Sequence, residues 1–308
     1  MATVASLADV GADVVVVANT EDSLGECPLW DDREQRLIWT NINGKVLHTI
    51  SVAPDGALSA PTTTELPEKA GSFALRESSP GLLLALETGF YLTHALGGDL
   101  TPVPSVYDSE RVDGVRLNDG RVDRSGRFVC GAIHNTEPAA YVYQLAADLT
   151  SRRLLPDAVQ ISNSICFSPA GDVLYFADSP THDILAFPYA SDAAPPSAPR
   201  VFATVGSGPG LPVPDGSCID EEGCLWNAQY GGGKVVRYRP DGTVDREIAC
   251  PATQLTCCGF GGPDLDVLFI TSARQNLDES AVEANPLHGA VFAVRPGVRG
   301  LPEDRFRG

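Results

Sequence analysis

The sequence has little of what marks a helical bundle, a membrane protein or a nucleic-acid-binding protein. Its 308 residues include one Met, and 22 Lys and Arg face 40 Asp and Glu. A net charge of -18 repels phosphate backbones and anionic membrane surfaces, so we expect neither nucleic acid nor membrane as a partner. No apolar run approaches the length of a membrane span. The N-terminal run MATVASLADVGADVVVVANT has no basic residue, unlike a signal peptide, and the chain is expected to be cytoplasmic.

The eight cysteines lack the spacing of a metal site. They include no CxxC pair, and no pair of histidines accompanies them, which argues against a zinc ribbon. Most of them stand inside apolar runs typical of strands. They are therefore interpreted as buried thiols in a reducing cytoplasm.

What the sequence does contain is a repeat. Six short hydrophobic runs recur, each after a turn, and the third residue of each serves as an anchor. The anchors are separated by 46, 44, 47, 50 and 44 residues, close to the period of a four-stranded propeller blade. A second β-patterned run follows each anchor, and turn signals such as PDG at 54–56 and 240–242 close several hairpins. The anchors are Trp39, Ala85, Val129, Phe176, Trp226 and Ile270.

This repeat predicts an all-β fold, a six-bladed β-propeller with a central channel. With 30 Gly and 24 Pro, the composition suits many short strands and turns. Residues 1–308 are expected to form a single domain, as a monomer or a small homo-oligomer. Pairing of the N-terminal segment MATVASLADV with the last copy would close the ring and remove exposed strand edges.

Another residue recurs 11 to 13 positions before each anchor. Because these residues occupy one place in the repeat, radial repetition should bring them to a similar depth around the channel. Taken singly, the Asp of PDGSC and the Asn of RLNDGR are ordinary turn residues. Four acidic or amide residues at one phase of the repeat favour a site over six separate turns. The six residues are Glu26, Ser72, Asn118, Asn163, Asp215 and Cys257.

A divalent metal ion is the simplest ligand for this ring. Two buried carboxylates, Glu26 and Asp215, repel each other unless a cation, a proton or an Arg intervenes. Together with Asn163 they offer only oxygen ligands, which suit Ca²⁺, Mg²⁺ or Mn²⁺, while Zn²⁺ and Fe²⁺ also bind carboxylates. Three protein ligands leave positions for water and substrate, as in catalytic sites.

The chain also resembles the regucalcin and gluconolactonase family of sugar lactonases. The motifs are GECPLWD at 25–31, RLNDGRVDRSGRF at 116–128, SNSICFSPAGDVLYFADS at 162–179, PDGSCIDEEGCLWNA at 214–228 and CCGFGGPDLDVLFITSA at 257–273. They occur in the family's order over most of the chain. WDDREQRLIW, YGGGKVVRYRPDGTVD and CCGFGGPDLD are most similar to bacterial-type lactonases of sugar catabolism, including arabinonolactonases.

The resemblance implies one catalytic divalent metal at the mouth of the channel. It implies that Glu26, Asn163 and Asp215 are the metal ligands and that Arg116 and Asn118 hold the substrate. Asp119 is then interpreted as a turn and strand-capping residue.

Two departures from the family pattern concern this site. Ser164 follows Asn163 where relatives commonly have Gly, and GAIHNTEP at 131–138 replaces Gly-Thr-Met followed by acidic residues. His134 lies in that second segment, on the side of the expected pocket.

The expected reaction is hydrolysis of a pentono- or hexonolactone to its aldonic acid, with the metal polarising the carbonyl. Asp215 is the best candidate for the general base. Two alternatives remain open: a metal-dependent aryl ester or phosphotriester hydrolase, and a non-enzymatic calcium-binding propeller.

Overall fold

The computed structural model describes residues 3–193, 198–206, 208, 210 and 212–308. Two compact units divide the chain. The first unit comprises Met1–Glu65 and Leu211–Glu303, and the second comprises Leu66–Gly210 and Asp304–Gly308. The expectation of a single domain over 1–308 stays a prediction. No helix in the described part of the chain is long and apolar enough to cross a membrane.

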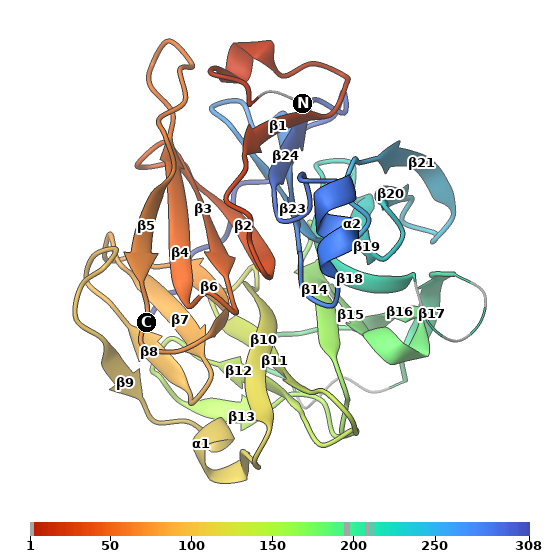
Figure 1. Cartoon of the computed structure of the whole chain (residues 1–308). Coiled ribbons are helices and arrows are strands. Elements are labelled where there is room, and N and C mark those ends of the chain that lie inside the picture. The colour runs from red at the N-terminus through yellow and green to blue at the C-terminus, as the bar shows by residue number, and fades with distance from the viewer. Residues whose placement is uncertain (1–2, 194–197, 207, 209, 211) are drawn as a thin grey trace. The chain divides into compact units, whose positions relative to one another are not determined.

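The first unit holds three four-stranded antiparallel sheets (Figure 1). It also carries the 3-10 helix η1 (Leu7–Asp9) and the short helix α2 (Glu279–Ala284). The sheets are β2 (Gly25–Asp31), β3 (Arg36–Asn41), β4 (Val46–Ser51) and β5 (Thr62–Glu65); β18 (Val213–Ile219), β19 (Leu225–Tyr230), β20 (Lys234–Tyr238) and β21 (Val244–Ala249); and β22 (Leu255–Gly261), β23 (Val267–Ser272), β24 (Val291–Val294) and β1 (Val15–Ala18).

The second unit holds three further sheets of the same kind. It carries helix α1 (Val106–Glu110) and the 3-10 helix η2 (Ser179–Thr181). The sheets are β6 (Ala70–Leu75), β7 (Leu82–Leu86), β8 (Phe90–Leu92) and β9 (Thr101–Val103); β10 (Val115–Val122), β11 (Phe128–His134), β12 (Val142–Leu145) and β13 (Ser151–Arg153); and β14 (Ser162–Phe167), β15 (Val173–Asp178), β16 (Asp183–Pro188) and β17 (Arg200–Thr204).

The predicted repeat is confirmed. Every anchor lies in the second strand of its sheet, and the β-patterned run after it forms the third strand. The anchors are apolar and almost completely buried, with Trp39 and Trp226 each 0% exposed. A repeated Asp supports the turn between first and second strands in three sheets, where Asp31, Asp123 and Asp220 each accept a hydrogen bond from the backbone amide two residues later.

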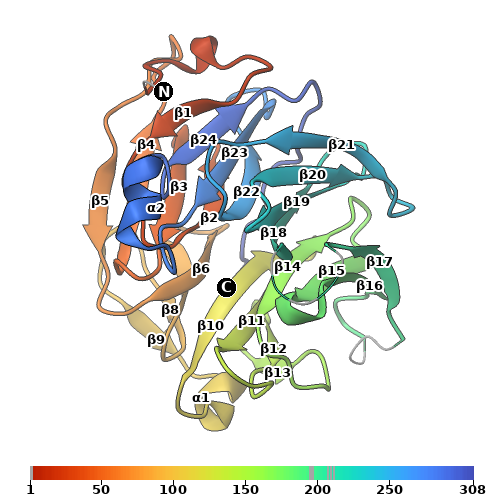
Figure 2. The same ribbon diagram turned by 45° about the vertical axis from the view of Figure 1, so that its right-hand side comes forward.

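The N-terminal strand completes the last sheet. β1 pairs antiparallel with β24, so residues from both ends of the sequence lie side by side in this sheet (Figures 1 and 2). The pairing strand is Val15–Ala18, outside the MATVASLADV segment, in which Thr3 forms only an isolated bridge to Val16. The apolar run VVVVA can bury both of its faces, whereas the segment before it contains Asp9 and Ser6.

First strands of neighbouring sheets approach one another closely within each unit. β10 contacts β6 and β14, and β22 contacts β2 and β18. At Gly71 on β6, an added Cβ would lie 2.4 Å from the backbone oxygen of Leu117 on β10. At Gly216 on β18, it would lie 2.3 Å from Sγ of Cys257 on β22. Glycine is therefore required at these two points because any side chain would separate the strands.

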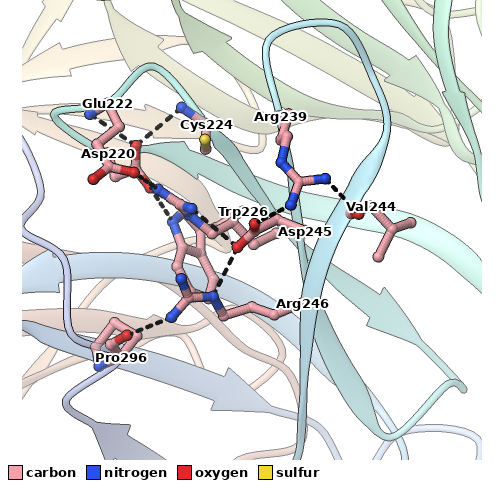
Figure 3. Close-up of polar contacts among 10 residues, drawn as sticks. Asp220, Glu222, Cys224, Trp226, Arg239, Val244, Asp245, Arg246 and Pro296 are labelled. Atoms are coloured by element: carbon pink, nitrogen blue, oxygen red, sulfur yellow. Dashed lines mark hydrogen bonds and ion pairs between the residues drawn. The ribbon is translucent and has the colours of Figure 1, made fainter.

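A buried ion-pair network joins the strands of the β18–β21 sheet (Figure 3). Asp220, which is 0% exposed, accepts from Trp226 Nε1 and Arg237 Nε, both at 2.8 Å. Arg237 also donates to Asp245 at 3.0 Å. At the exposed rim, Arg239 donates to the other oxygen of Asp245 at 2.6 Å. The buried part of this network holds β18, β19, β20 and β21 in one arrangement.

We expect Gly71→Ala to lower the free energy of unfolding by about 1–3 kcal/mol, because the backbone of β10 cannot shift far enough to accommodate a new methyl group. Urea denaturation measures this change. Gly11→Ala is the control, since nothing lies within 4 Å of its added Cβ, and it should change stability by less than about 1 kcal/mol. Equal effects of the two substitutions would contradict the close approach of β6 and β10.

We expect Asp220→Ala to destabilise the protein by about 3–5 kcal/mol, since it leaves the buried Arg237 guanidinium and Trp226 indole without a major acceptor. Arg239→Ala breaks an exposed pair in the same network and should cost below about 1 kcal/mol. Urea denaturation of both variants at one pH checks the difference. A loss for Asp220→Ala no larger than that for Arg239→Ala would show that the buried network does not stabilise this sheet.

Candidate active site

The six ring residues lie in the same part of the first strand of their sheets. The first strand of each sheet contains a shift of register, where one or two residues have no partner on the second strand. Such bulges bend a strand and redirect its side chains, and they are frequent beside active sites. All six predicted residues lie at or within these shifts, which fall between Glu26 and Leu29, Ala70 and Ser72, Leu117 and Gly120, Asn163 and Cys166, Pro214 and Ser217, and Leu255 and Cys258.

Glu26 and Asp215, the two predicted carboxylate ligands, both lie in the first unit. Glu26 is half-buried, and its Oε2 accepts a hydrogen bond from the amide of Cys27, 3.2 Å away. Cys27 lies within the shift of register and has the left-handed φ of 52°. Asp215 is 7% exposed, and its backbone oxygen accepts from Asn227 Nδ2 at 2.9 Å. Asn227 on β19 therefore fixes the bulge that presents Asp215.

The phenol of Tyr230 lies in the same neighbourhood. Burial raises the pKa of Tyr230, and the negative charges of Asp215 and Glu26 raise it further, while Gln275 and Asn276 act in the opposite direction. The phenol therefore remains protonated at neutral pH and is a neutral hydrogen-bond donor.

In the second unit, Arg116, Asn118 and Asn163 form one directed chain of hydrogen bonds. Arg116 Nη1 donates to Asn118 Oδ1 at 2.7 Å. Asn118 Nδ2 donates to Asn163 Oδ1 at 3.1 Å, and Asn163 Nδ2 donates to Ser179 Oγ at 2.9 Å. Because a guanidinium can only donate, it fixes the orientation of both amides. Asn163 Oδ1 consequently faces Asn118, and the structure brings these three predicted residues together.

Asp119 connects two sheets of the second unit. Its Oδ2 accepts a hydrogen bond of 2.7 Å from the amide of Ile165, in the bulge of β14. Burial raises the pKa of Asp119 to about 6, although the hydrogen bond from Ile165 opposes this shift. The predicted turn and strand-capping role is wrong, because Asp119 lies within β10 and the amide that donates to it lies inside β14 of the neighbouring sheet.

Both departures from the family pattern have a local explanation. Ser164 is completely buried and adopts φ 60°, the left-handed region that favours glycine, at the bulge of β14. His134 ends β11, and its Nδ1 accepts from the amide of Glu137 at 3.2 Å, which places the proton of the neutral ring on Nε2. His134 therefore holds a turn within the segment that departs from the family pattern.

Three residues of the site neighbourhood were not predicted: Asn227, Tyr230 and Ser179. Asn227 and Tyr230 lie one and four residues after the anchor Trp226, and Ser179 lies three after Phe176. Their position in or directly after the second strand, beside the bulge of the first, is the signal that identifies them. The repeat predicts where the second strand lies. Polar residues there have many structural roles, so their type alone does not mark them as part of a site.

No group of three His, Cys, Asp or Glu side chains suited to a metal occurs among the residues that the structure describes. The predicted ligand set contains two carboxylates and one amide, so it does not depend on such a group. Carboxylate and amide oxygens fit a hard divalent cation.

Comparison with known proteins agrees with the fold and the motifs. A family model described as SMP-30/Gluconolactonase/LRE-like region matches residues 24–274. The 6-deoxy-6-sulfogluconolactonase of Pseudomonas putida is 39% identical over 291 residues, which are 92% of this chain and 95% of that protein. The L-arabinolactonase of Azospirillum brasilense is 37% identical over 297 residues, 95% of each chain.

A solved structure gives the same result for the fold. The calcium-binding protein regucalcin from Agrobacterium tumefaciens str. C58 is 31% identical, and the match covers 100% of both chains with a TM-score of 0.87. With its six four-stranded sheets, the chain is a six-bladed β-propeller, as the repeat predicted. The extent of these matches shows that the chain belongs to the SMP-30/gluconolactonase/LRE-like family.

Proposed function

We propose that this protein hydrolyses the ring ester of a sugar lactone, a pentono- or hexonolactone, to the aldonic acid. The observation that carries the proposal is the placement of Glu26, Asn118, Asn163 and Asp215 at the bulges of four first strands. Two relatives whose names state lactonase activity match over 92% and 95% of the chain. A small neutral sugar lactone is the substrate class, and the cytoplasm is the proposed compartment.

The proposed metal ligands are Glu26, Asn163 and Asp215. Two features of the described residues support them. The donor set consists of oxygens alone, which suits Ca²⁺, Mn²⁺ or Mg²⁺ and is compatible with Zn²⁺ or Fe²⁺. The amide of Asn163 is also oriented by hydrogen bonds on both of its polar atoms, so its oxygen has a fixed direction. A bound cation would act as a Lewis acid toward the lactone carbonyl.

The residues of the chain account for substrate orientation. Arg116 and Asn118 are the proposed contacts of the sugar hydroxyls and ring oxygen. Their mutual hydrogen bond reduces the side-chain freedom that would otherwise be lost on binding. Arg116 is half-buried, which strengthens its hydrogen bonds relative to those of an exposed side chain.

Asp215 is the proposed general base. Its carboxylate takes a proton from water as the water oxygen bonds to the carbonyl carbon. The ring C–O bond then breaks, and the proton passes to the departing ring oxygen, which becomes a hydroxyl group. Asn227 supports this role because it holds the backbone oxygen of Asp215 and so limits movement of the carboxylate.

A second function, calcium binding without turnover, is favoured by one observation only. The solved relative that matches the whole chain is described as a calcium-binding protein. This alternative predicts metal binding with no hydrolysis of any lactone.

Hydrolysis should be lost when the metal is removed and restored when a metal is added back. We expect metal-stripped protein to release no protons from pentono- or hexonolactones, and one of Mn²⁺, Ca²⁺, Mg²⁺, Zn²⁺ or Fe²⁺ to restore turnover. Glu26→Gln should weaken metal binding in calorimetry by at least about tenfold, because it removes a charged ligand. Glu247→Gln is the control, since Glu247 is exposed and pairs with Lys234, so its loss should leave affinity unchanged. Tight metal binding without turnover would move the assignment to the calcium-binding alternative.

Loss of the proposed base should reduce turnover while the fold survives. We expect Asp215→Asn to lower kcat by about 10²-fold or more, the scale of general base catalysis. Asp241→Asn is a matched control, because Asp241 stands in a second Pro-Asp-Gly sequence at an exposed turn. Turnover and metal content are measured on the same samples. A metal-loaded Asp215→Asn variant with near-wild-type kcat would exclude the base role.

A further inference from the structure

The side chain of Asn163 can bind a cation through only one of its two ends. A carboxamide carries an oxygen acceptor at one end and an NH₂ donor at the other, and the two ends are similar in size and shape. A hard divalent cation binds the oxygen alone. Asn163 is 5% exposed, so water does not freely solvate whichever end faces the protein. Metal binding therefore requires protein contacts that hold this amide in one orientation.

Two neighbouring side chains hold the amide, one at each end. Asn118 Nδ2 donates to Asn163 Oδ1 at 3.1 Å, and Asn118 is itself oriented by the guanidinium of Arg116. At the other end, Asn163 Nδ2 donates to Ser179 Oγ at 2.9 Å, the shorter of the two bonds to this amide. Because a carbonyl-type oxygen has two lone pairs, Asn163 Oδ1 can accept from Asn118 and still bind a cation.

Ser179 is itself held in place by the backbone around it. It is 3% exposed and directly follows β15 as the first residue of η2. Its amide donates to the backbone oxygen of Ile161 at 2.9 Å. The carboxylate of Asp178 accepts from the amide of Ile161 at 2.8 Å and from that of Gln160 at 3.0 Å. The hydroxyl of Ser179 therefore has a fixed place beside the start of β14.

We propose that Ser179 is a positioning residue for the metal ligand Asn163, and that its hydroxyl sets the affinity of the site for the metal. Ser179 accepts from the NH₂ end and so keeps the oxygen of Asn163 available to the cation. This inference rests on the proposed function, because it requires Asn163 to be a ligand. Partners that hydrogen-bond to metal ligands without touching the metal commonly control metal affinity in this way.

The same sheet offers a matched control serine. Ser168 directly follows β14, at the end of the strand away from Ser162, and is 8% exposed. Its Oγ accepts from the amide of Val173 at 3.0 Å and donates to Asp172 at 2.7 Å. Ser179→Ala and Ser168→Ala thus remove the same atom from buried sites of one sheet. Only the first removes a hydroxyl that is bonded to a proposed metal ligand.

The test measures metal affinity rather than turnover. Metal-stripped protein is titrated in a calorimeter with Ca²⁺ and with Mn²⁺. We expect Ser179→Ala to raise the Kd about tenfold, the scale on which loss of such a partner weakens a metal site. Ser168→Ala should leave the Kd unchanged. An unchanged Kd for Ser179→Ala, or an equal rise for both variants, would overturn the proposal.

Repeating Ser179→Ala in an Asn163→Asp background separates orientation from packing. A carboxylate has two equivalent oxygens and no donor, so it needs no partner that accepts from it. We expect the tenfold effect of Ser179→Ala to fall below about threefold in that background, a coupling that the double-mutant cycle measures. Thermal unfolding of each variant checks that the fold is retained. A tenfold effect in both backgrounds would assign Ser179 a purely structural role and would overturn the proposal.

Asn163→Ala distinguishes failure of this inference from failure of the ligand set. If Asn163→Ala weakens metal binding by about tenfold or more and Ser179→Ala does not, Asn163 remains a ligand and only the role of Ser179 is overturned. If Asn163→Ala binds metal as tightly as the wild type, or the wild type binds neither ion, the proposed ligand set fails and the role of Ser179 fails with it.

Discussion

The close approach of first strands within each unit is the constraint on which the site depends. Neighbouring strands meet backbone to backbone at Gly71 and backbone to thiol at Gly216, so they cannot continue as flat, regular ladders. Each first strand instead carries a bulge, which releases one or two residues from pairing. Bulges also redirect side chains. Packing and the proposed function are thus coupled at the bulges that carry Glu26, Asn118, Asn163 and Asp215.

The repeat predicted most of the fold because its hydrophobic anchors are set by burial. Trp39, Val129 and Trp226 are all completely buried in second strands, and their spacing alone indicated six sheets. The completing strand was harder to place. Residues 15–18 supply it because they are continuously apolar, but a short apolar run fits a strand in any sheet.

From the sequence, only the candidate site residues that recur at a fixed position in the repeat could be predicted. The position 11 to 13 residues before an anchor identified Glu26, Asn118, Asn163 and Asp215, each in its own copy of the repeat. It could not reveal Asn227, whose side chain on the second strand holds the backbone oxygen of Asp215. Nor could it show that the carboxylate of Asp119 accepts from an amide of the next sheet, a contact that exists only after two copies pack together.

The proposed substrate is compatible with the net charge of the protein. A neutral lactone is insensitive to the net charge of -18, so the field of the protein does not oppose its approach. Hydrolysis converts it to an aldonate anion, which the same field repels. The acidic composition would then favour release of the product.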